Sequence, residues 1–467
     1  MPLLDSRFVQ EATRATVKGP RPEGEFTGVS TDSRQVAPGQ LFVALAGPNF
    51  DGHDYVAQSL AGGAAAAVVR RGFTWPENPA ACLFQVDDPL LALGDLAAAW
   101  RRGFQAPLVG LTGSNGKTTT KEMLAAILGR GGEILKNHGN FNNLIGLPLT
   151  LLQLASRHTA SVLEMGMNAP GEIARLTQIA QPDVGLVTNV GPAHLGPLGS
   201  MEAVARAKGE LYEGLAPGAT AVVNLDDPFL APWAGRLSQR VVSFGLTNPK
   251  AQVQGHDLSQ LGGRSAFTLG LPGEDRRRVR LATPGRHNVA NALAAAAAAW
   301  ALGRPADEIS AGLEEFTPVK GRLNLVWSVG GPLLVDDTYN ANPASVAGGV
   351  EALKGVAAGR RLGLILGDML ELGEFAPRLH REAGRGAVEA GCQAVLALGP
   401  LAGEVAAGAR EAGLPPERAR ACGNREELRL AAVEILDAGW AVLVKGSRGM
   451  AMEKVVDDLI WAEWEAV

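Results

Sequence analysis

A polar, glycine-containing turn between two apolar segments carries the clearest chemistry in this sequence. It reads TGSNGKTT over residues 112–119, follows an apolar run over 107–111 and precedes a helical pattern that extends to residue 128. A strand, such a turn and a helix together direct backbone N–H groups at phosphate oxygens, while the lysine reaches the terminal phosphates and the threonine hydroxyl binds Mg²⁺. The residues that we predict to bind a nucleoside triphosphate are Gly113, Ser114, Asn115, Gly116, Lys117, Thr118 and Thr119.

This motif is a shortened variant of the usual phosphate loop. The usual form has a glycine five residues before Gly116, where this chain has Leu111. Chance is the alternative explanation, because the chain contains 59 glycines. The strand pattern before the turn and the helical pattern after it favour phosphate binding, since both elements are needed to present the loop.

Three further residues have side chains that suit a metal or phosphate site. Glu164 ends the apolar run over 161–163, and His194 follows a second buried-strand pattern over 184–189. Ligands of open parallel sheets bind outside the carboxyl ends of the strands, where a carboxylate suits a divalent cation. A glutamate that merely opens a loop and a solvated histidine are the alternatives. Lys208 lies on a helical segment, where a lysine is most often at the surface.

Polar loops are the remaining candidates for ligand contact. The loop over 137–143 contains four asparagines, whose amides combine donors with acceptors. The loop over 30–34 groups hydroxyls, a carboxylate and a guanidinium, although simple turn chemistry also explains it. Asn288 and Asn291 share one face at the start of an alanine-rich helix. Capping that helix and reading an adenine edge are both open interpretations.

Length and composition restrict the class of protein. With 467 residues, 46% hydrophobic and 19% charged, the chain is expected to form roughly two to four domains with large cores. A net charge of −5 and a single short basic cluster, Arg276–Arg278, argue against nucleic-acid binding. Three widely spaced cysteines, together with the lack of a signal-length or membrane-length apolar run, predict a reduced, soluble, cytoplasmic protein that binds no membrane.

The order of the apolar runs predicts an α/β fold with three domains. Residues 1–104 are expected to form a small N-terminal α/β domain, and 105–318 a central P-loop domain with a mainly parallel sheet. Residues 319–467 are expected to form a Rossmann-like, doubly wound C-terminal domain without a phosphate loop of its own. Short alternating runs over 239–283 indicate a β-rich insert or a sheet edge.

Nine segments taken together resemble the Mur ligase family: TGSNGKTTTKEM, LEMG, NVGPAHL, AKGE, GRHNVANALAA, KGR, DDTYNANPASV, LGDMLELG and KGSRG. With the STDSR loop at 30–34, the resemblance covers nearly the whole chain. It implies a three-domain enzyme that forms an amide bond with ATP, through an acyl phosphate, and releases ADP. The N-terminal domain would hold the UDP part of the substrate, the central domain ATP, and the C-terminal domain would close over both.

The segments DDTYNANP, LGDMLELG and NNLIGLPLTLL favour one activity within that family. This activity adds D-alanyl-D-alanine to UDP-N-acetylmuramoyl-tripeptide in peptidoglycan precursor synthesis. The implied partners are these two substrates and ATP with Mg²⁺, and a monomer is the default expectation. The sequence does not identify the third, diamino acid residue of the acceptor peptide.

The resemblance also implies roles for single residues. The catalytic set comprises Lys117, His194, Lys208 and Arg322, of which Arg322 would contact the γ-phosphate from the closing domain. The metal set, expected to hold two Mg²⁺ ions, comprises Thr118, Glu164, His194 and Lys208, with Lys208 carbamylated into a carboxylate. The nucleotide set adds Asn288 and Asn291 for adenine and Asp337 for ribose. The substrate set comprises Ser33, Arg34, Asn142 and Asn143.

The chain departs from the family pattern at two places. Gly196 and Pro197 stand where the family commonly has Glu-Gly, and Leu144 stands where a glutamate is frequent, so no role of those two carboxylates is carried over. The nearest alternative function is a sibling amide ligase or a folylpolyglutamate-type enzyme. A nucleotide-dependent switch is disfavoured because no guanine-reading N-K-x-D motif is present, and an inactive scaffold because every phosphate and metal position is filled.

Overall fold

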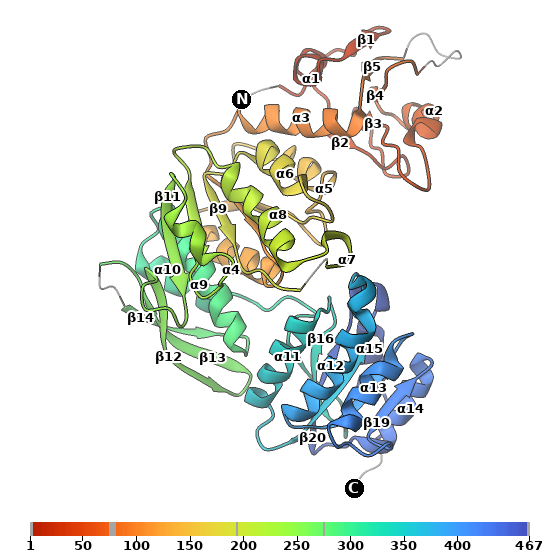
Figure 1. Ribbon diagram of the computed structural model, residues 1–467. Helices are drawn as coiled ribbons and strands as arrows, with labels where there is room; N and C mark the ends of the chain where they lie inside the picture. Colours follow the sequence, from red (N-terminus) through yellow and green to blue (C-terminus); the bar gives the residue numbers. More distant parts are fainter. Residues whose placement is uncertain (1–2, 74–80, 193–194, 274–275, 465–467) are drawn as a thin grey trace.

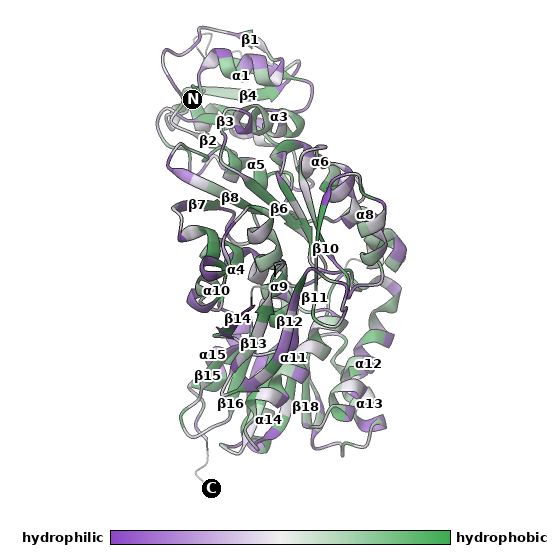
Figure 2. Cartoon of the chain, turned by 90° about the vertical axis from the view of Figure 1, so that its left-hand side faces the viewer, coloured by the Kyte–Doolittle hydropathy of each residue, from purple (hydrophilic) through white to green (hydrophobic). Residues whose placement is uncertain are grey.

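Three α/β domains follow one another along the molecule (Figure 1). The computed structural model describes residues 3–73, 81–192, 195–273 and 276–464. Each domain contains one sheet, with five, nine and six strands in chain order. Figure 2 shows these sheets from the side, with β1–β4 at one end, β6–β14 in the middle and β15–β18 at the other end. The expected three-domain α/β fold is therefore confirmed, while the limits at 104/105 and 318/319 stay predictions.

The N-terminal sheet has the strand order β1-β5-β4-β3-β2, and only the β1–β5 pair is antiparallel. Its strands are β1 Thr16–Lys18, β2 Val29–Ser30, β3 Leu41–Val43, β4 Ala66–Arg70 and β5 Leu83–Val86. The helices are α1 Ser6–Thr13, η1 Gly52–Tyr55, α2 Val56–Ala61 and α3 Pro89–Arg101.

The central sheet has the order β14-β13-β12-β11-β10-β9-β6-β8-β7. All pairs from β7 to β12 are parallel, whereas β12, β13 and β14 pair antiparallel, so the β-rich segment expected over 239–283 extends the edge of this sheet. The strands are β6 Leu108–Thr112, β7 Glu133–Lys136, β8 His158–Glu164, β9 Val184–Val187, β10 Thr220–Asn224, β11 Arg240–Gly245, β12 Val253–Leu261, β13 Arg264–Gly270 and β14 Arg276–Leu281. The helices are α4 Lys117–Gly129, α5 Gly146–Leu151, α6 Glu172–Ala180, α7 Leu195–Leu198, α8 Met201–Glu213, η2 Ala231–Gly235, α9 Arg286–Ala301 and α10 Ala306–Glu315.

The C-terminal sheet has the order β15-β16-β20-β17-β18-β19 and is parallel except for the β15–β16 pair. Its strands are β15 Asn324–Trp327, β16 Leu333–Asp337, β17 Arg361–Gly367, β18 Cys392–Leu398, β19 Ala419–Cys422 and β20 Trp440–Lys445. The helices are α11 Pro343–Val356, η3 Gly373–Phe375, α12 Ala376–Glu389, α13 Ala402–Glu411, α14 Arg425–Ile435, η4 Arg448–Met450 and α15 Glu453–Ile460.

Helix α9 packs against α4 and the central sheet through very small side chains. Alanine is the best helix former, and Ala294–Ala299 are all buried. Because these side chains are short, the helix lies close to its neighbours, and Asn291 in its second turn reaches the loop that precedes α4. The sequence pattern of α9 thus positions the asparagines at its start.

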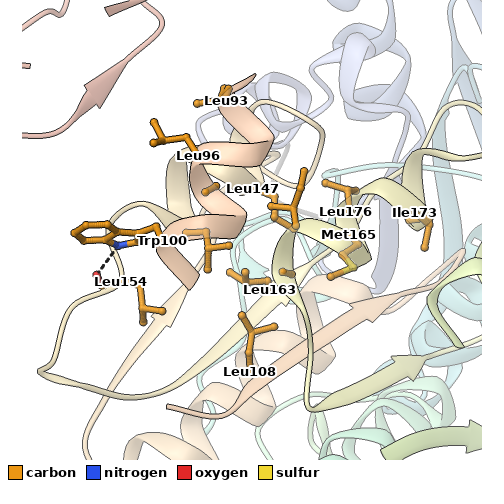
Figure 3. Packing of buried hydrophobic residues seen from close by; sticks show 14 of the residues in the cluster. Leu93, Leu96, Trp100, Leu108, Leu147, Leu154, Leu163, Met165, Ile173 and Leu176 are labelled. Atoms are coloured by element: carbon orange, nitrogen blue, oxygen red, sulfur yellow. Dashed lines mark hydrogen bonds between the residues drawn. The ribbon is translucent and has the colours of Figure 1, made fainter. Parts of the chain in front are cut away.

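Helix α3 joins the N-terminal and central domains through a shared core. Leu93, Leu96 and Trp100 of α3 lie near Leu147 and Leu154 of the central domain (Figure 3). The indole N–H of Trp100 donates to the Leu154 carbonyl at 3.0 Å, which satisfies its only polar group in the core. The C-terminal domain instead has its own two clusters of buried side chains. In the described part of the chain, no helix is both long and apolar enough to cross a membrane.

Candidate active site

The turn after β6 has the backbone shape of a phosphate loop. Gly116 precedes α4 with φ +80°, in the left-handed region that glycine enters without steric cost. A Cβ atom at Gly116 would lie 2.1 Å from Oδ1 of Asn291, which comes from the second turn of α9. Glycine is therefore needed here both for its backbone angle and for the close approach of α9.

Hydrogen bonds from the end of β9 hold this loop in place. The Asn115 N–H donates to Asn189 Oδ1 at 2.9 Å, and its carbonyl accepts from the Thr188 hydroxyl at 2.6 Å. The Ser114 hydroxyl donates to the Gly191 carbonyl at 3.0 Å. The loop is thus organised before a ligand binds, which lowers the entropic cost of binding.

Lys117 lies back over the loop at the start of α4. Its ammonium donates to the Gly113 carbonyl at 2.7 Å. Burial lowers the pKa of Lys117, and the nearby Arg322 lowers it further, while Glu164 opposes the shift. A polyphosphate at the loop would favour the charged form of this lysine by the same electrostatic argument.

Glu164, Thr118 and Arg322 form a chain of hydrogen bonds across two domains. The Thr118 hydroxyl donates to Glu164 Oε2 at 2.9 Å and accepts from Arg322 Nη2, also at 2.9 Å. The guanidinium of Arg322 stacks over the ring of Tyr339 at 4.2 Å from the ring centroid. Three residues predicted from the sequence therefore meet at one point.

Two asparagines of the amide-rich loop orient Glu164. Asn142 Nδ2 donates to Glu164 Oε1 at 2.9 Å. Asn137 accepts from the Glu164 N–H at 3.0 Å and donates to its carbonyl at 2.8 Å, which closes a paired contact with the backbone. Asn143 instead accepts from the N–H groups of Ile145 and Gly146 at the start of α5. Asn137 was not among the predicted site residues, although it belongs to the loop that the sequence singled out.

Lys208 of α8 is 2% exposed and lines the same cavity. Within the described residues, no hydrogen bond or ion pair reaches its amino group. Burial, together with the positive charge of Lys117, moves the pKa of Lys208 well below its ordinary value. His194, which the sequence assigns to the same metal site, lies outside the described residues.

The remaining predicted nucleotide residues lie near the start of α9 and at the end of β16. Asn288 Nδ2 donates to Thr283 Oγ1 at 2.9 Å and to the Pro284 carbonyl at 2.7 Å, so this amide stabilises the turn before α9. Asn291 Nδ2 donates to Asn288 Oδ1 at 3.2 Å. Asp337 pairs with the buried Lys445 of β20, whose ammonium also donates to the Asn340 carbonyl at 2.8 Å.

One cavity of about 630 Å³ between the central and C-terminal domains unites most of these residues. The sequence-predicted residues that line it are Gly113, Ser114, Asn115, Gly116, Lys117, Thr118, Thr119, Asn142, Asn143, Glu164, Lys208, Asn288, Asn291, Arg322 and Asp337. Ser33 and Arg34 do not line it. Arg34 is exposed and pairs with Asp32, which lowers the pKa of that carboxyl to about 2.

Tyr339, Asn342, Lys445 and Arg448 also line the cavity, but they were not among the predicted site residues. All four follow or end the strands β16 and β20, which are neighbours in the C-terminal sheet. Their position at the carboxyl ends of parallel strands was a usable signal. The sequence alone did not show that these strand ends face the phosphate loop of another domain.

The two departures from the family pattern have local structural explanations. The Gly196 N–H donates to the Glu371 carbonyl of the C-terminal domain at 3.2 Å, and a Cβ atom at Gly196 would lie 3.2 Å from the backbone nitrogen of Gly373. A longer side chain there would meet the neighbouring domain. Leu144 is partly buried and packs against the core that α3 shares with the central domain.

The donor set of the cavity combines cations with hard oxygen ligands. Lys117 and Arg322 carry positive charge to the loop, while the Thr118 hydroxyl and the Glu164 carboxylate are oxygen donors that Mg²⁺ prefers. Among the described residues, no group of three or more His, Cys, Asp or Glu side chains is placed to hold a metal ion. The described chain thus offers a phosphate site with a partial ligand set for a hard cation.

Comparison with known proteins agrees with this arrangement. Residues 25–101 match the Mur ligase family catalytic domain, 111–299 the Mur ligase middle domain, and 321–448 the Mur ligase glutamate ligase domain. The UDP-N-acetylmuramoyl-tripeptide–D-alanyl-D-alanine ligase of Escherichia coli (strain K12) is 39% identical over 429 residues, which cover 92% of each chain.

Solved structures show the same similarity in three dimensions. MurF from Acinetobacter baumannii is 34% identical with a TM-score of 0.90, over 99% of this chain and 100% of that one. MurF ligase from Thermotoga maritima, in complex with ADP, is 29% identical with a TM-score of 0.83, over 93% and 97% of the two chains. The chain matches three family domains in order, has the phosphate loop described above, and has relatives that span nearly its whole length. This protein therefore belongs to the Mur ligase family.

Proposed function

We propose that this protein is an ATP-dependent ligase that joins D-alanyl-D-alanine to the peptide carboxylate of UDP-N-acetylmuramoyl-tripeptide in peptidoglycan precursor synthesis. The observation that carries the proposal is the cavity in which Lys117 and Thr118 of the central domain meet Arg322 at the start of the C-terminal domain. Such a cavity between domains suits a reaction in which ATP and two further substrates must meet. The similarity to ligases of this name supports the choice of substrates.

The proposed reaction has two steps. A carboxylate oxygen of the tripeptide attacks the γ-phosphorus of ATP, the bond from this phosphorus to the bridging oxygen breaks, and ADP leaves. The amino nitrogen of the dipeptide then attacks the carbon of the acyl phosphate and forms a tetrahedral intermediate. The C–O bond breaks, phosphate leaves, the nitrogen loses a proton, and an amide remains.

Charge stabilisation is the main task of the protein in the first step. Phosphoryl transfer spreads negative charge over the transferred group, so fixed positive groups lower the barrier. Lys117 and the N–H groups of the loop hold the phosphates from the central domain, and Arg322 approaches from the other domain. Asn288 and Asn291 would contact adenine, and Asp337 would contact the ribose.

Mg²⁺ fits the oxygen donors that the structure brings together. Thr118 and Glu164 would hold one ion, which neutralises phosphate charge when bound. A carbamate on Lys208, together with His194, would help to hold a second. Carbamylation joins the neutral amino nitrogen to CO₂ with loss of one proton, and it would turn a buried amine without a described partner into an oxygen ligand. Lys208 is buried and its amino group has no partner among the described residues, which supports this modification.

The remaining assignments stay proposals of the same kind. Ser33 and Arg34, with the Asn142–Asn143 loop, would hold the nucleotide-linked substrate, and residues 1–104 would form the UDP-binding domain. Residues 105–318 would bind ATP and 319–467 would close over both. A monomeric state also stays a prediction.

A product analysis tests the function directly. The protein is incubated with ATP, Mg²⁺, UDP-N-acetylmuramoyl-tripeptide and D-alanyl-D-alanine, and the products are identified by mass. We expect one ADP, one phosphate and one pentapeptide product per turnover. ADP release with a free amino acid but not with the dipeptide would point to a sibling ligase, and nucleotide binding without amide product would point to a switch protein.

A further inference from the structure

One side chain, that of Asn342, bonds both to its own helix and to the neighbouring domain. Its Oδ1 accepts from the Ser345 N–H at 2.9 Å and caps the start of α11. Its Nδ2 donates to Asn115 Oδ1 of the phosphate loop at 2.8 Å. Asn342 is 9% exposed, so this second contact is largely protected from water.

The contact with Asn115 is specific in its direction. The Oδ1 of Asn342 is occupied by the helix cap, so only its NH₂ group can face the loop, and an amide NH₂ cannot accept a hydrogen bond. Asn115 must therefore present its oxygen. The backbone of Asn115 is already held by Asn189 and Thr188 of the central domain, so its side chain projects from a fixed base.

Capping alone does not require an asparagine at this position. Serine, aspartate and asparagine all cap helices, because the cap needs only a side-chain oxygen. Helix α14 of the same domain provides a comparison: Asn424 caps it by accepting from the Glu427 N–H at 2.9 Å. Within the described residues, the Asn424 amide nitrogen makes no hydrogen bond. The hydrogen bond from Asn342 Nδ2 to Asn115 is thus not required for helix capping.

We infer that Asn342 is a positioning residue that holds the C-terminal domain on the phosphate loop through its hydrogen bond to Asn115. Two residues that this domain contributes to the cavity lie close to α11: Tyr339 is in the segment between β16 and α11, and Arg322 stacks on its ring. A bond from the start of α11 to the loop fixes their distance from the phosphates. Small displacements of reacting groups cost large factors in rate. The inference rests on the proposed function only where it uses turnover as a readout.

The test replaces Asn342 by serine, which keeps a neutral cap but is too short to reach Asn115. Asn424→Ser makes the same change at a cap without an interdomain bond and serves as the matched control. Asn115→Ala removes the acceptor from the other side, and the Asn115→Ala/Asn342→Ser double variant completes a thermodynamic cycle. Asn342→Asp is a second capping variant in case the serine variant folds poorly.

Three properties are measured for each full-length protein: the melting temperature, the radius of gyration from small-angle X-ray scattering, and the kcat and KM for ATP.

We expect Asn342→Ser to melt at the wild-type temperature and to have a larger radius of gyration. Its kcat should fall roughly three- to tenfold, because this factor corresponds to the net free energy of one hydrogen bond. Asn115→Ala should behave in the same way, and the double variant should be no worse than the poorer single variant. Asn424→Ser should match the wild type in every measurement. The inference would be overturned if Asn342→Ser had the radius of gyration and kcat of the wild type. It would also be overturned if the losses of kcat in the two single variants multiplied in the double variant. If the wild type made no amide product, the proposed function would fail, while the scattering and melting data would still decide this inference.

Discussion

Two cations of the cavity are held by neutral groups rather than by carboxylates. Lys117 donates to a backbone carbonyl, and Arg322 donates to a hydroxyl and stacks on an aromatic ring. Their positive charge therefore remains available to a ligand. The carboxylate of Glu164 is in turn oriented by the neutral Asn142 amide and Thr118 hydroxyl, and it forms no ion pair with another described residue. At the scale of single residues, the site is prepared for an anion and a hard cation together.

Replacing Lys117 by alanine tests the first of these charges. We expect turnover below a tenth of the wild-type value, because the loss of a preorganised group at developing charge costs about 10²- to 10³-fold in rate. Steady-state ADP release is the measurement, and the exposed Lys250→Ala variant is the control. Turnover above a tenth of wild type would contradict the role of Lys117.

Lys208 gives a second prediction at this scale. Lys208→Ala should be nearly inactive and should recover part of its turnover in acetate or formate, since a small carboxylate would replace the oxygens of the proposed carbamate. Lys117→Ala should show no such recovery, because it lacks a cation rather than an anion. Turnover is measured across a series of carboxylate concentrations. A fully active Lys208→Ala enzyme would mean that this lysine has no metal-binding role.

At the scale of elements, close approach between two helix starts shapes the site. Helix α4 begins at the phosphate loop, and α9 brings Asn291 against Gly116 because its alanine face packs closely on α4. The site thus depends on small residues that lie outside the loop itself. The same reasoning explains why the loop tolerates no side chain at that glycine.

Gly116→Ala tests this packing, with Gly171→Ala as its matched control. Both glycines precede a helix with nearly the same φ, +80° and +85°, but a Cβ atom at Gly171 would have no heavy atom within 4 Å. Each variant carries the cost of a left-handed alanine, about 1–2 kcal/mol of stability. Only Gly116→Ala should also lose ATP-analogue affinity, by tenfold or more, as measured by titration calorimetry. Equal affinity in the two variants would show that the loop can move away from α9.

At the scale of the whole molecule, the three domains do not share their cores equally. The N-terminal and central domains are joined through α3, whereas the C-terminal domain has separate clusters. Figure 3 shows the residues that join the first two domains. The central and C-terminal domains instead meet through hydrogen bonds such as those of Thr118, Asn115 and Gly196, and through contacts of α11 with α9 and β12. We therefore expect two cooperative units rather than three.

Thiol labelling separates the opening of the two ends of the molecule, because buried Cys82 lies in the N-terminal domain and buried Cys392 and Cys422 lie in the C-terminal domain. Burial raises the pKa of Cys82 to about 11, of Cys392 to about 12 and of Cys422 to about 11, so each thiol reacts only when its surroundings open. Leu96→Ala in α3 should cost about 2–5 kcal/mol and speed the labelling of Cys82 alone. Leu364→Ala in the C-terminal core should speed the labelling of Cys392 and Cys422 alone. Equal acceleration of all three thiols by either variant would show a single unit.

Local patterns allowed much of the fold and part of the site to be predicted. Apolar runs indicated β6, β8 and β9, and the glycine turn before Lys117 indicated the phosphate loop. These features depend on neighbouring residues, so periodicity and turn chemistry reveal them. The shared core around Trp100 was not predicted, and the runs over 239–283 left a β-rich insert and a sheet edge both open. The reason is that periodicity reports which residues are buried but not against what.

The amino-acid sequence by itself determined the α/β class, the phosphate loop and, through the resemblance of its motifs, the family. Tertiary structure alone decided which polar residues meet. Asn115 and Asn342 are 227 residues apart, and Thr118 and Arg322 are 204 apart, yet each pair forms a hydrogen bond. No local pattern encodes such pairs, because the packing of helices and sheets places their side chains within reach only after the domains have assembled.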